Sequence, residues 1–209
     1  QAFGSSFEKV GPGQLSDIAC FSTHPTKTLY SFRDGGFIVS NNKSLIDRIR
    51  KIRNNGIVAN NRDECDEFGF NSRMDELQAK ILIKRLKDIK KMVRLRNLNA
   101  IIYNTNLDKR YFYLDEDKSK FSISHQFFLV LCKRRDELHE YLNKNGVQAI
   151  KYFHIPMYKQ KAFKNIFHKK IKLKNSEYLE NKSLHLPIRE NLKKREIIHI
   201  CNLMNNFYN

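Results

Sequence analysis

A lysine at the end of a short polar turn is the residue of this sequence best placed to do chemistry. Residues 17–22 are apolar enough to form a short buried strand, and the turn that follows them ends in Lys27. An amine held at a strand end loses part of its hydration and can act as a nucleophile toward an aldehyde. The hydroxyl groups of Ser22 and Thr26 could hold a phosphate nearby. The alternative is that Lys27 is an ordinary solvated surface lysine.

The composition favours a folded chain with a basic surface. Of the 209 residues, 41% are hydrophobic, and 39 Lys and Arg against 22 Asp and Glu give a net charge of +17. The basic residues are spread along the chain, with a mild concentration at 159–174. Without RNP aromatics or Cys/His fingers, nucleic acid is a poor candidate partner. A basic, non-catalytic module that binds a polyanion or nucleic acid remains the alternative to an enzyme.

Cysteine usage and hydropathy indicate a cytoplasmic location. Cys20, Cys65, Cys132 and Cys201 have long spacings without a C-x-x-C pair, so we expect reduced thiols and no metal site. The longest apolar run, at 127–132, is far shorter than the roughly 18 residues of a membrane helix. We expect no membrane partner. The sequence begins at Gln1 without a signal peptide, which we interpret as a fragment or a processed chain.

The periodicity predicts an α/β organisation in two parts. A strand at 35–40 follows a Gly-Gly turn, a helix covers 43–53, and residues 57–70 form a polar loop. A helix with apolar positions at helical spacing covers 74–103, and its length of about 45 Å is enough to bridge two domains. The elements expected after it are strands at 127–132, 147–153 and 183–187 and helices at 134–145 and 194–207. Alternation of strands and helices is typical of α/β folds.

Four blocks, in order and with matching spacing, carry a family resemblance. They are Phe21-Ser22-Thr23-His24-Pro25-Thr26-Lys27, Gly35-Gly36, Arg53-Asn54-Asn55-Gly56 and Gly69-Phe70-Asn71-Ser72-Arg73-Met74-Asp75-Glu76-Leu77-Gln78-Ala79. They resemble the F-S-F-H-P-T-K-N-L, R-N-x-G and G-[YF]-N-x-R-[ML]-x-E-[LM]-Q-A patterns of the DegT/DnrJ/StrS family. Residues 135–138, 154–158 and 183–187 agree more loosely, so the resemblance covers essentially the whole chain. The family comprises aminotransferases that act on nucleotide sugars and depend on pyridoxal 5′-phosphate.

The resemblance implies the C-terminal part of the fold of aspartate aminotransferase, known as fold type I. Residues 1–85 would be the end of the large cofactor-binding domain, 86–105 a bridging helix, and 106–209 a small α/β C-terminal domain. The implied reaction moves an amino group from a donor such as glutamate to a keto-deoxysugar on a nucleoside diphosphate. The extended spacing between Lys27 and Gly35-Gly36, and the residues Asn71-Ser72-Arg73, resemble members that act on 3-keto sugars rather than 4-keto sugars. Such sugars serve surface polysaccharides or glycans.

The resemblance also assigns residues. Lys27 would carry the cofactor as a Schiff base and shuttle the proton, Ser22 would bond the cofactor phosphate, and Gln1 would lie beside the ring. Asn71 would reach the cofactor phosphate of a neighbouring subunit, which implies a homodimer. The expected substrate-binding residues are His24, Arg73, His154 and Tyr158.

Simpler roles remain open for several of these residues. Ser22 could satisfy a turn, and Asn71 could cap a helix that begins near 72 or 73. His24 and His154 could be ordinary half-buried histidines.

Four departures from the family pattern affect what the chain is expected to do. Thr28 stands where Asn is common, Tyr158 stands where His is common, and residues 30–33 replace a small Gly-containing stretch. The family's N-terminal part has no counterpart here. That part carries a phosphate cradle, an aromatic that stacks on the ring and an Asp for the pyridine nitrogen. We therefore expect an N-terminally truncated chain that is inactive alone.

Overall fold

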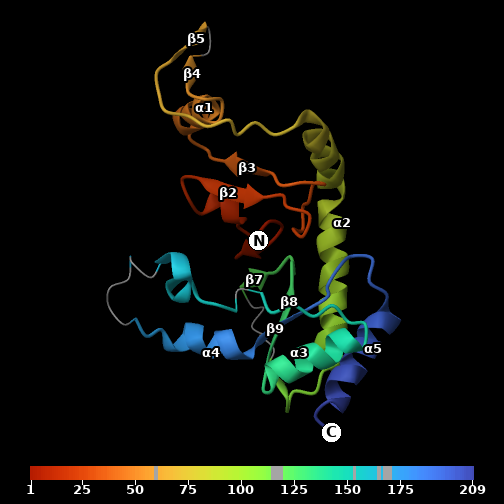
Figure 1. Cartoon of the computed structure of the whole chain (residues 1–209). Coiled ribbons are helices and arrows are strands. Elements are labelled where there is room, and N and C mark those ends of the chain that lie inside the picture. The colour runs from red at the N-terminus through yellow and green to blue at the C-terminus, as the bar shows by residue number, and fades with distance from the viewer. Residues whose placement is uncertain (59–60, 114–119, 153, 164–165, 167–170) are drawn as a thin grey trace. The chain divides into compact units, whose positions relative to one another are not determined.

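The computed structural model describes residues 1–209 except 59–60, 114–119, 153, 164–165 and 167–170 (Figure 1). The chain forms two compact units. Unit 1 comprises Gln1–Arg94 and Asp117–Gln126, and unit 2 comprises Leu95–Glu116 and Phe127–Asn209. The expected division at 85/86 and 105/106 concerns the whole protein and stays a prediction.

The described residues of unit 1 contain three two-stranded antiparallel ladders. β2 (Ala19–Ser22) pairs with β3 (Gly36–Val39), and helix α1 (Lys43–Ile52) follows, which confirms two predicted strands and a predicted helix. The other ladders join β1 (Ser6–Phe7) to β7 (Phe121–Ser122) and β4 (Ile57–Val58) to β5 (Asn61–Cys65). A 3-10 turn covers Pro12–Gln14. The prediction of a loop at 57–70 is therefore wrong in part, because β5 is exposed throughout and carries no alternating apolar pattern.

Helix α2 (Glu76–Asn106) is confirmed as a single long element of 31 residues. Its start is fixed by Asp75, whose Oδ1 accepts the N–H groups of Leu77 (2.8 Å) and Gln78 (3.3 Å). A side-chain oxygen in this position satisfies donors that have no partner within the helix. The expected apolar stripe is only partly buried, since Leu77 is 64% exposed and Ile101 is 50% exposed. Apolar residues occur on more than one side of α2, so spacing alone does not identify the buried face.

Unit 2 is built on a three-stranded antiparallel sheet in the order β6-β8-β9. The strands are β6 (Phe112–Tyr113), β8 (Phe128–Cys132) and β9 (Ser183–Leu186). The helices are α3 (Arg135–Lys144), α4 (Lys174–Lys182) and α5 (Lys194–Asn206), and 3-10 turns cover Met157–Lys159 and Lys161–Phe163. Residues that are completely buried in this core come from β8, α3, β9 and α5; they include Val130, Leu138, Leu142, Leu184 and Ile197.

The predicted strand at 147–153 does not form over 147–152, and residue 153 lies outside the described residues. The N–H of Val147 donates to the carbonyl of Leu142 (2.9 Å), so the start of this segment closes the end of α3. Gly146 supports that closure with a φ of +78°, a left-handed conformation that favours glycine. Only Ile150 among the described residues of the segment pairs with β9, through one bridge to His185. Helix α4 was not predicted.

Three polar side chains of α2 bind the chain that follows β9. Arg96 donates to the carbonyl of Ile188 (3.2 Å) and pairs with the carboxylate of Glu190 (3.0 Å). Asn99 donates to the carbonyl of Arg189 (2.7 Å), and the Tyr103 hydroxyl donates to the carbonyl of Pro187 (2.8 Å). Because Arg96, Asn99 and Tyr103 are all buried, these bonds stabilise one placement of the segment.

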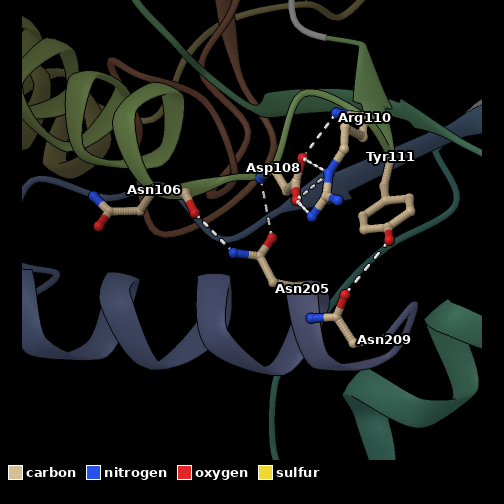
Figure 2. A network of polar contacts seen from close by, with 6 residues as sticks. All are labelled: Asn106, Asp108, Arg110, Tyr111, Asn205 and Asn209. Carbon is tan, nitrogen blue, oxygen red and sulfur yellow. Dashed lines mark hydrogen bonds and ion pairs between the residues drawn. The ribbon is translucent and has the colours of Figure 1, made fainter.

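Asn205 of α5 forms hydrogen bonds with the end of α2 and with the chain that follows it (Figure 2). The side chain of Asn205 donates to the carbonyl of Asn106 (2.9 Å) and accepts the N–H of Asp108 (3.1 Å). The hydroxyl of Tyr111 donates to Asn209 (3.4 Å) in the same network. The two bonds of Asn205 satisfy the carbonyl of Asn106, which has no partner within α2, and the N–H of Asp108 just after the helix.

The four cysteines are free thiols, as the sequence predicts. Cys20 and Cys65 are exposed, whereas Cys132 and Cys201 are buried. Burial raises the pKa of Cys132 to about 11 and that of Cys201 to about 12. The buried pair therefore serves as apolar filling. Within the described residues, no helix has the length and apolar character needed to cross a membrane.

Candidate active site around Lys27

Lys27 closes a tight turn directly after β2. The N–H of Lys27 donates to the carbonyl of His24 (2.9 Å), and Pro25 occupies the second position of the turn, where its fixed φ is favourable. Nδ1 of His24 accepts the N–H of Thr26 (3.2 Å) and lies 2.9 Å from the Thr26 hydroxyl. This ring nitrogen of His24 is thus engaged in shaping the turn.

The residues after Lys27 are anchored below the surface. Thr28 and Leu29 are buried, and Ser31 donates its N–H and its hydroxyl to the carbonyl of Thr23, both at 2.8 Å. Thr23 itself has no exposed surface. Lys27 is half-buried, and no hydrogen bond or ion pair from the described residues engages its ammonium group. The backbone is therefore held in place while the amine is available to a ligand. Nothing in the local sequence marked Thr23 as the buried centre of this loop.

Ser22 takes part in the same turn. Its Oγ accepts the N–H of His24 (3.3 Å), as the simpler interpretation of this residue predicts. The side chain is exposed, and its hydroxyl proton remains available for donation to an anion. The phosphate-binding role of Ser22 stays a prediction.

Gln1 is exposed and lies within electrostatic range of Lys27. Whether the Gln1 side chain faces a cofactor ring stays a prediction.

Asn71 belongs to an extended segment beside the end of α1. It forms an isolated antiparallel bridge with Asn54, and its Oδ1 accepts the Nε–H of Arg73 (3.3 Å). Asn71 and Arg73 are both exposed. The alternative that Asn71 caps the following helix is wrong, because Asp75 performs that function for α2.

Two glycines allow the backbones in this segment to approach each other closely. A Cβ at Gly56 would lie 1.8 Å from the carbonyl oxygen of Glu67, and a Cβ at Gly69 would lie 2.2 Å from the nitrogen of Gly56. Gly56 also has a φ of +75°. The two backbones approach so closely that neither position accepts a side chain, and this approach sets the position of Asn71.

His154 and Tyr158 belong to unit 2. Nδ1 of His154 lies 3.0 Å from the carbonyl of Lys151, and the side chain is exposed. The Tyr158 hydroxyl donates to Glu177 (2.9 Å). Desolvation, followed by the hydrogen bond to Glu177, raises the pKa of Tyr158. Both residues are therefore anchored locally, and their substrate-binding roles stay predictions.

A hollow of about 600 Å³ lies elsewhere in unit 1. It is lined by Gln14–Asp17 together with Asn41 and Asn42, and it includes none of the predicted site residues. The part of the chain that the structure describes contains no cluster of three or more His, Cys, Asp or Glu side chains arranged for a metal.

Comparison with known proteins identifies the family. Residues 1–205 match the profile of the DegT/DnrJ/EryC1/StrS aminotransferase family. One relative, a pleiotropic regulatory protein of Geobacillus stearothermophilus, is 28% identical over 100% of this chain and 56% of its own length. Another, the UDP-N-acetyl-3-dehydro-alpha-D-glucosamine 3-aminotransferase of Acidithiobacillus ferrooxidans, is 30% identical over 98% of this chain and 54% of its own length. The chain thus spans about half the length of these relatives.

A solved structure supports the same assignment. Streptomyces venezuelae DesV, in complex with a ketimine intermediate, has a TM-score of 0.92 and 27% identity, and the alignment covers 99% of this chain and 56% of DesV. The similarity confirms the predicted fold class, the C-terminal part of a fold type I transferase. The chain belongs to the DegT/DnrJ/EryC1/StrS aminotransferase family.

Proposed function

We propose that the complete protein transfers an amino group to a keto-deoxysugar on a nucleoside diphosphate, with pyridoxal 5′-phosphate bound covalently at Lys27. One observation carries the proposal: the amine of Lys27 is unengaged among the described residues, on a turn that hydrogen bonds hold at both ends. Membership of an aminotransferase family favours this function over the basic binding module. Because the chain spans about half of its relatives, the activity belongs to the complete protein.

The donor set around the turn fits this cofactor. Lys27 supplies a primary amine for the aldehyde, and Ser22 supplies a hydroxyl donor for the phosphate. A Cβ at Gly35 would lie 2.8 Å from Oγ1 of Thr23, and a Cβ at Gly36 would lie 2.7 Å from the carbonyl oxygen of Phe21. The Gly-Gly pair thus allows β3 to approach the strand end that carries the turn. Pyridoxal phosphate, when bound, supplies an electron sink for carbanion chemistry.

The chain's own residues bind, orient and move a proton. The Lys27 amine would hold the cofactor and, when free, would take up and return a proton at its Nζ. The turn at His24–Lys27 fixes the origin of that side chain, which preserves the proton-transfer geometry. Gln1 lies beside the ring in this proposal.

The remaining predicted residues face the substrate or a second subunit in this proposal. Asn71 is exposed and reaches the cofactor phosphate of a partner copy, so the active enzyme is a homodimer. Arg73 and His24 bind the sugar nucleotide from unit 1. His154 and Tyr158 are further substrate-binding residues in this proposal. A nucleotide sugar and an amino acid such as glutamate are the substrates, and we place the protein in the cytoplasm.

Lys27→Ala in the full-length protein tests the assignment. Borohydride reduction after incubation with pyridoxal phosphate is expected to label Lys27 in the wild type and to leave the variant unlabelled. Lys84→Ala is the matched control, because Lys84 is an exposed lysine of unit 1 outside the site. Undiminished labelling of the Lys27→Ala protein refutes the proposal.

The position of the keto group is tested with substrates. The name of the Acidithiobacillus relative, a 3-aminotransferase, supports a 3-keto sugar, as does the wording of the sequence blocks. Purified enzyme is expected to aminate a 3-keto nucleotide sugar with glutamate, with a higher kcat/KM than for the matched 4-keto sugar. The reverse preference contradicts the 3-keto assignment and leaves the transferase assignment intact.

A further inference from the structure

We propose that Arg85 is a positioning residue, which holds the loop carrying Lys27 against helix α2. The inference rests on the proposed function, because it assigns Arg85 to the same site. It deepens that function by explaining what fixes residues 30–33, the stretch in which this chain departs from the family pattern.

Arg85 contacts the loop in two ways at once. Its guanidinium carbon lies 3.7 Å from the centroid of the Tyr30 ring, and Nη1 donates to the Tyr30 carbonyl (2.5 Å). The ring of Phe32 lies 5.2 Å from the same carbon. A planar guanidinium can stack on an aromatic face while its N–H groups donate in the plane. A lysine ammonium has no plane with which to reproduce both contacts.

A second residue of α2 holds the next part of the loop. Oε1 of Gln78 accepts the N–H of Phe32 (2.9 Å). Gln78 and Arg85 are seven residues apart, which places them on the same face of the helix, two turns from one another. The loop is therefore attached to α2 at both Tyr30 and Phe32.

The attachment reaches Lys27 through a short and buried connection. Only Thr28 and Leu29 separate Lys27 from Tyr30, and both are buried. Beyond Tyr30, Ser31 binds back to the carbonyl of Thr23. The chain from Thr23 to Ser31 is thus a closed loop with Lys27 inside it. Because the buried residues cannot shift independently of their surroundings, a displacement of Tyr30 is transmitted to Lys27.

The test compares Arg85→Ala, Arg85→Lys and the control Lys84→Ala in the full-length protein. Hydrogen exchange of the amides of Lys27, Ser31 and Phe32 is expected to be about tenfold faster in Arg85→Ala and unchanged in the control. Arg85→Lys is expected to give an intermediate rate. The fraction of Lys27 labelled by pyridoxal phosphate and borohydride is expected to fall severalfold in Arg85→Ala, with a shifted pH profile and partial recovery in Arg85→Lys.

The outcomes separate this inference from the proposed function. If Arg85→Ala changes neither the hydrogen exchange of the loop amides nor the labelling of Lys27, the role of Arg85 is overturned. This holds even where Lys27→Ala abolishes the labelling. Full labelling of Lys27→Ala refutes the proposed function, while exchange still decides whether Arg85 holds the loop. If Arg85→Ala does not fold, Tyr30→Leu removes the ring and keeps the backbone acceptor. Its loop amides are expected to exchange severalfold faster, and wild-type rates there overturn the inference.

Discussion

Replacing Gly69 by alanine tests whether the segment of Asn71 is positioned by a direct approach of two backbones. A Cβ at this position would lie 2.2 Å from the nitrogen of Gly56 and 2.4 Å from the carbonyl carbon of Asn55. Ordinary contact begins at 3.4 Å, so the segments must separate by about 1.2 Å, the difference between 3.4 and 2.2 Å. Because both neighbouring atoms belong to the backbone, no side-chain rotation can relieve the clash.

The separation breaks hydrogen bonds that join the two segments. The N–H of Phe70 donates to the carbonyl of Ile52 (2.7 Å), and the N–H of Asn55 donates to the carbonyl of Phe70 (3.0 Å). A hydrogen bond of this kind contributes about 1 kcal/mol, so with the added strain we expect Gly69→Ala to lower the free energy of unfolding by about 2–4 kcal/mol.

Urea denaturation followed by far-UV circular dichroism measures this change, and hydrogen exchange at Asn55 and Phe70 localises it. Gly11→Ala is the control, because the nearest atom to its Cβ is 3.7 Å away and its φ of −75° suits alanine. The control is expected to stay within about 0.5 kcal/mol of the wild type. A Gly69→Ala protein as stable as the control would show that the two segments do not constrain each other.

Two further predictions concern unit 2. Tyr103→Phe removes the donor to the Pro187 carbonyl and is expected to cost about 1–2 kcal/mol in urea denaturation; a midpoint equal to that of the exposed control Tyr178→Phe argues against the bond. Burial lowers the pKa of His185 in the folded protein below its ordinary value of 6.5. The neutral side chain therefore contributes stability above pH 6.5, and this stability is lost as the pH falls through the lowered folded-state pKa. Between about pH 7 and pH 5 the wild type is expected to lose more stability than His185→Gln. The pKa of His139 is also lowered, but His139 is present in both proteins and so does not affect the difference. Equal losses of stability in the two proteins contradict the prediction.

The sequence predicts the elements that are defined locally. The strands around Phe21 and Phe37, helix α1 and helix α2 follow from apolar spacing and from Gly and Asn signals at their ends. The turn that ends in Lys27 follows from Pro25 and its polar neighbours. The role of Lys27 in cofactor attachment is predicted from the family resemblance, not from the spacing of apolar residues.

What the sequence does not reveal depends on partners distant along the chain. Nothing near Arg96 or Tyr103 indicates that their side chains bind carbonyls more than 80 residues away. The expected strand at 147–153 has the right residue types, but Val147 is used to close α3. The contact of Arg85 with Tyr30 spans 55 residues and joins a helix to a loop. Contacts between such distant residues depend on tertiary packing, which cannot be predicted from local patterns in a single sequence.

The contrast between exposed and buried thiols provides two ready attachment points for spectroscopic probes. Thiolate is the form that reacts with maleimides, and Cys132 and Cys201 combine burial with a raised pKa, which protects them at neutral pH. Cys20 lies on β2, two residues before Ser22, and Cys65 ends β5. A fluorophore on Cys20 would therefore report events at the lysine turn.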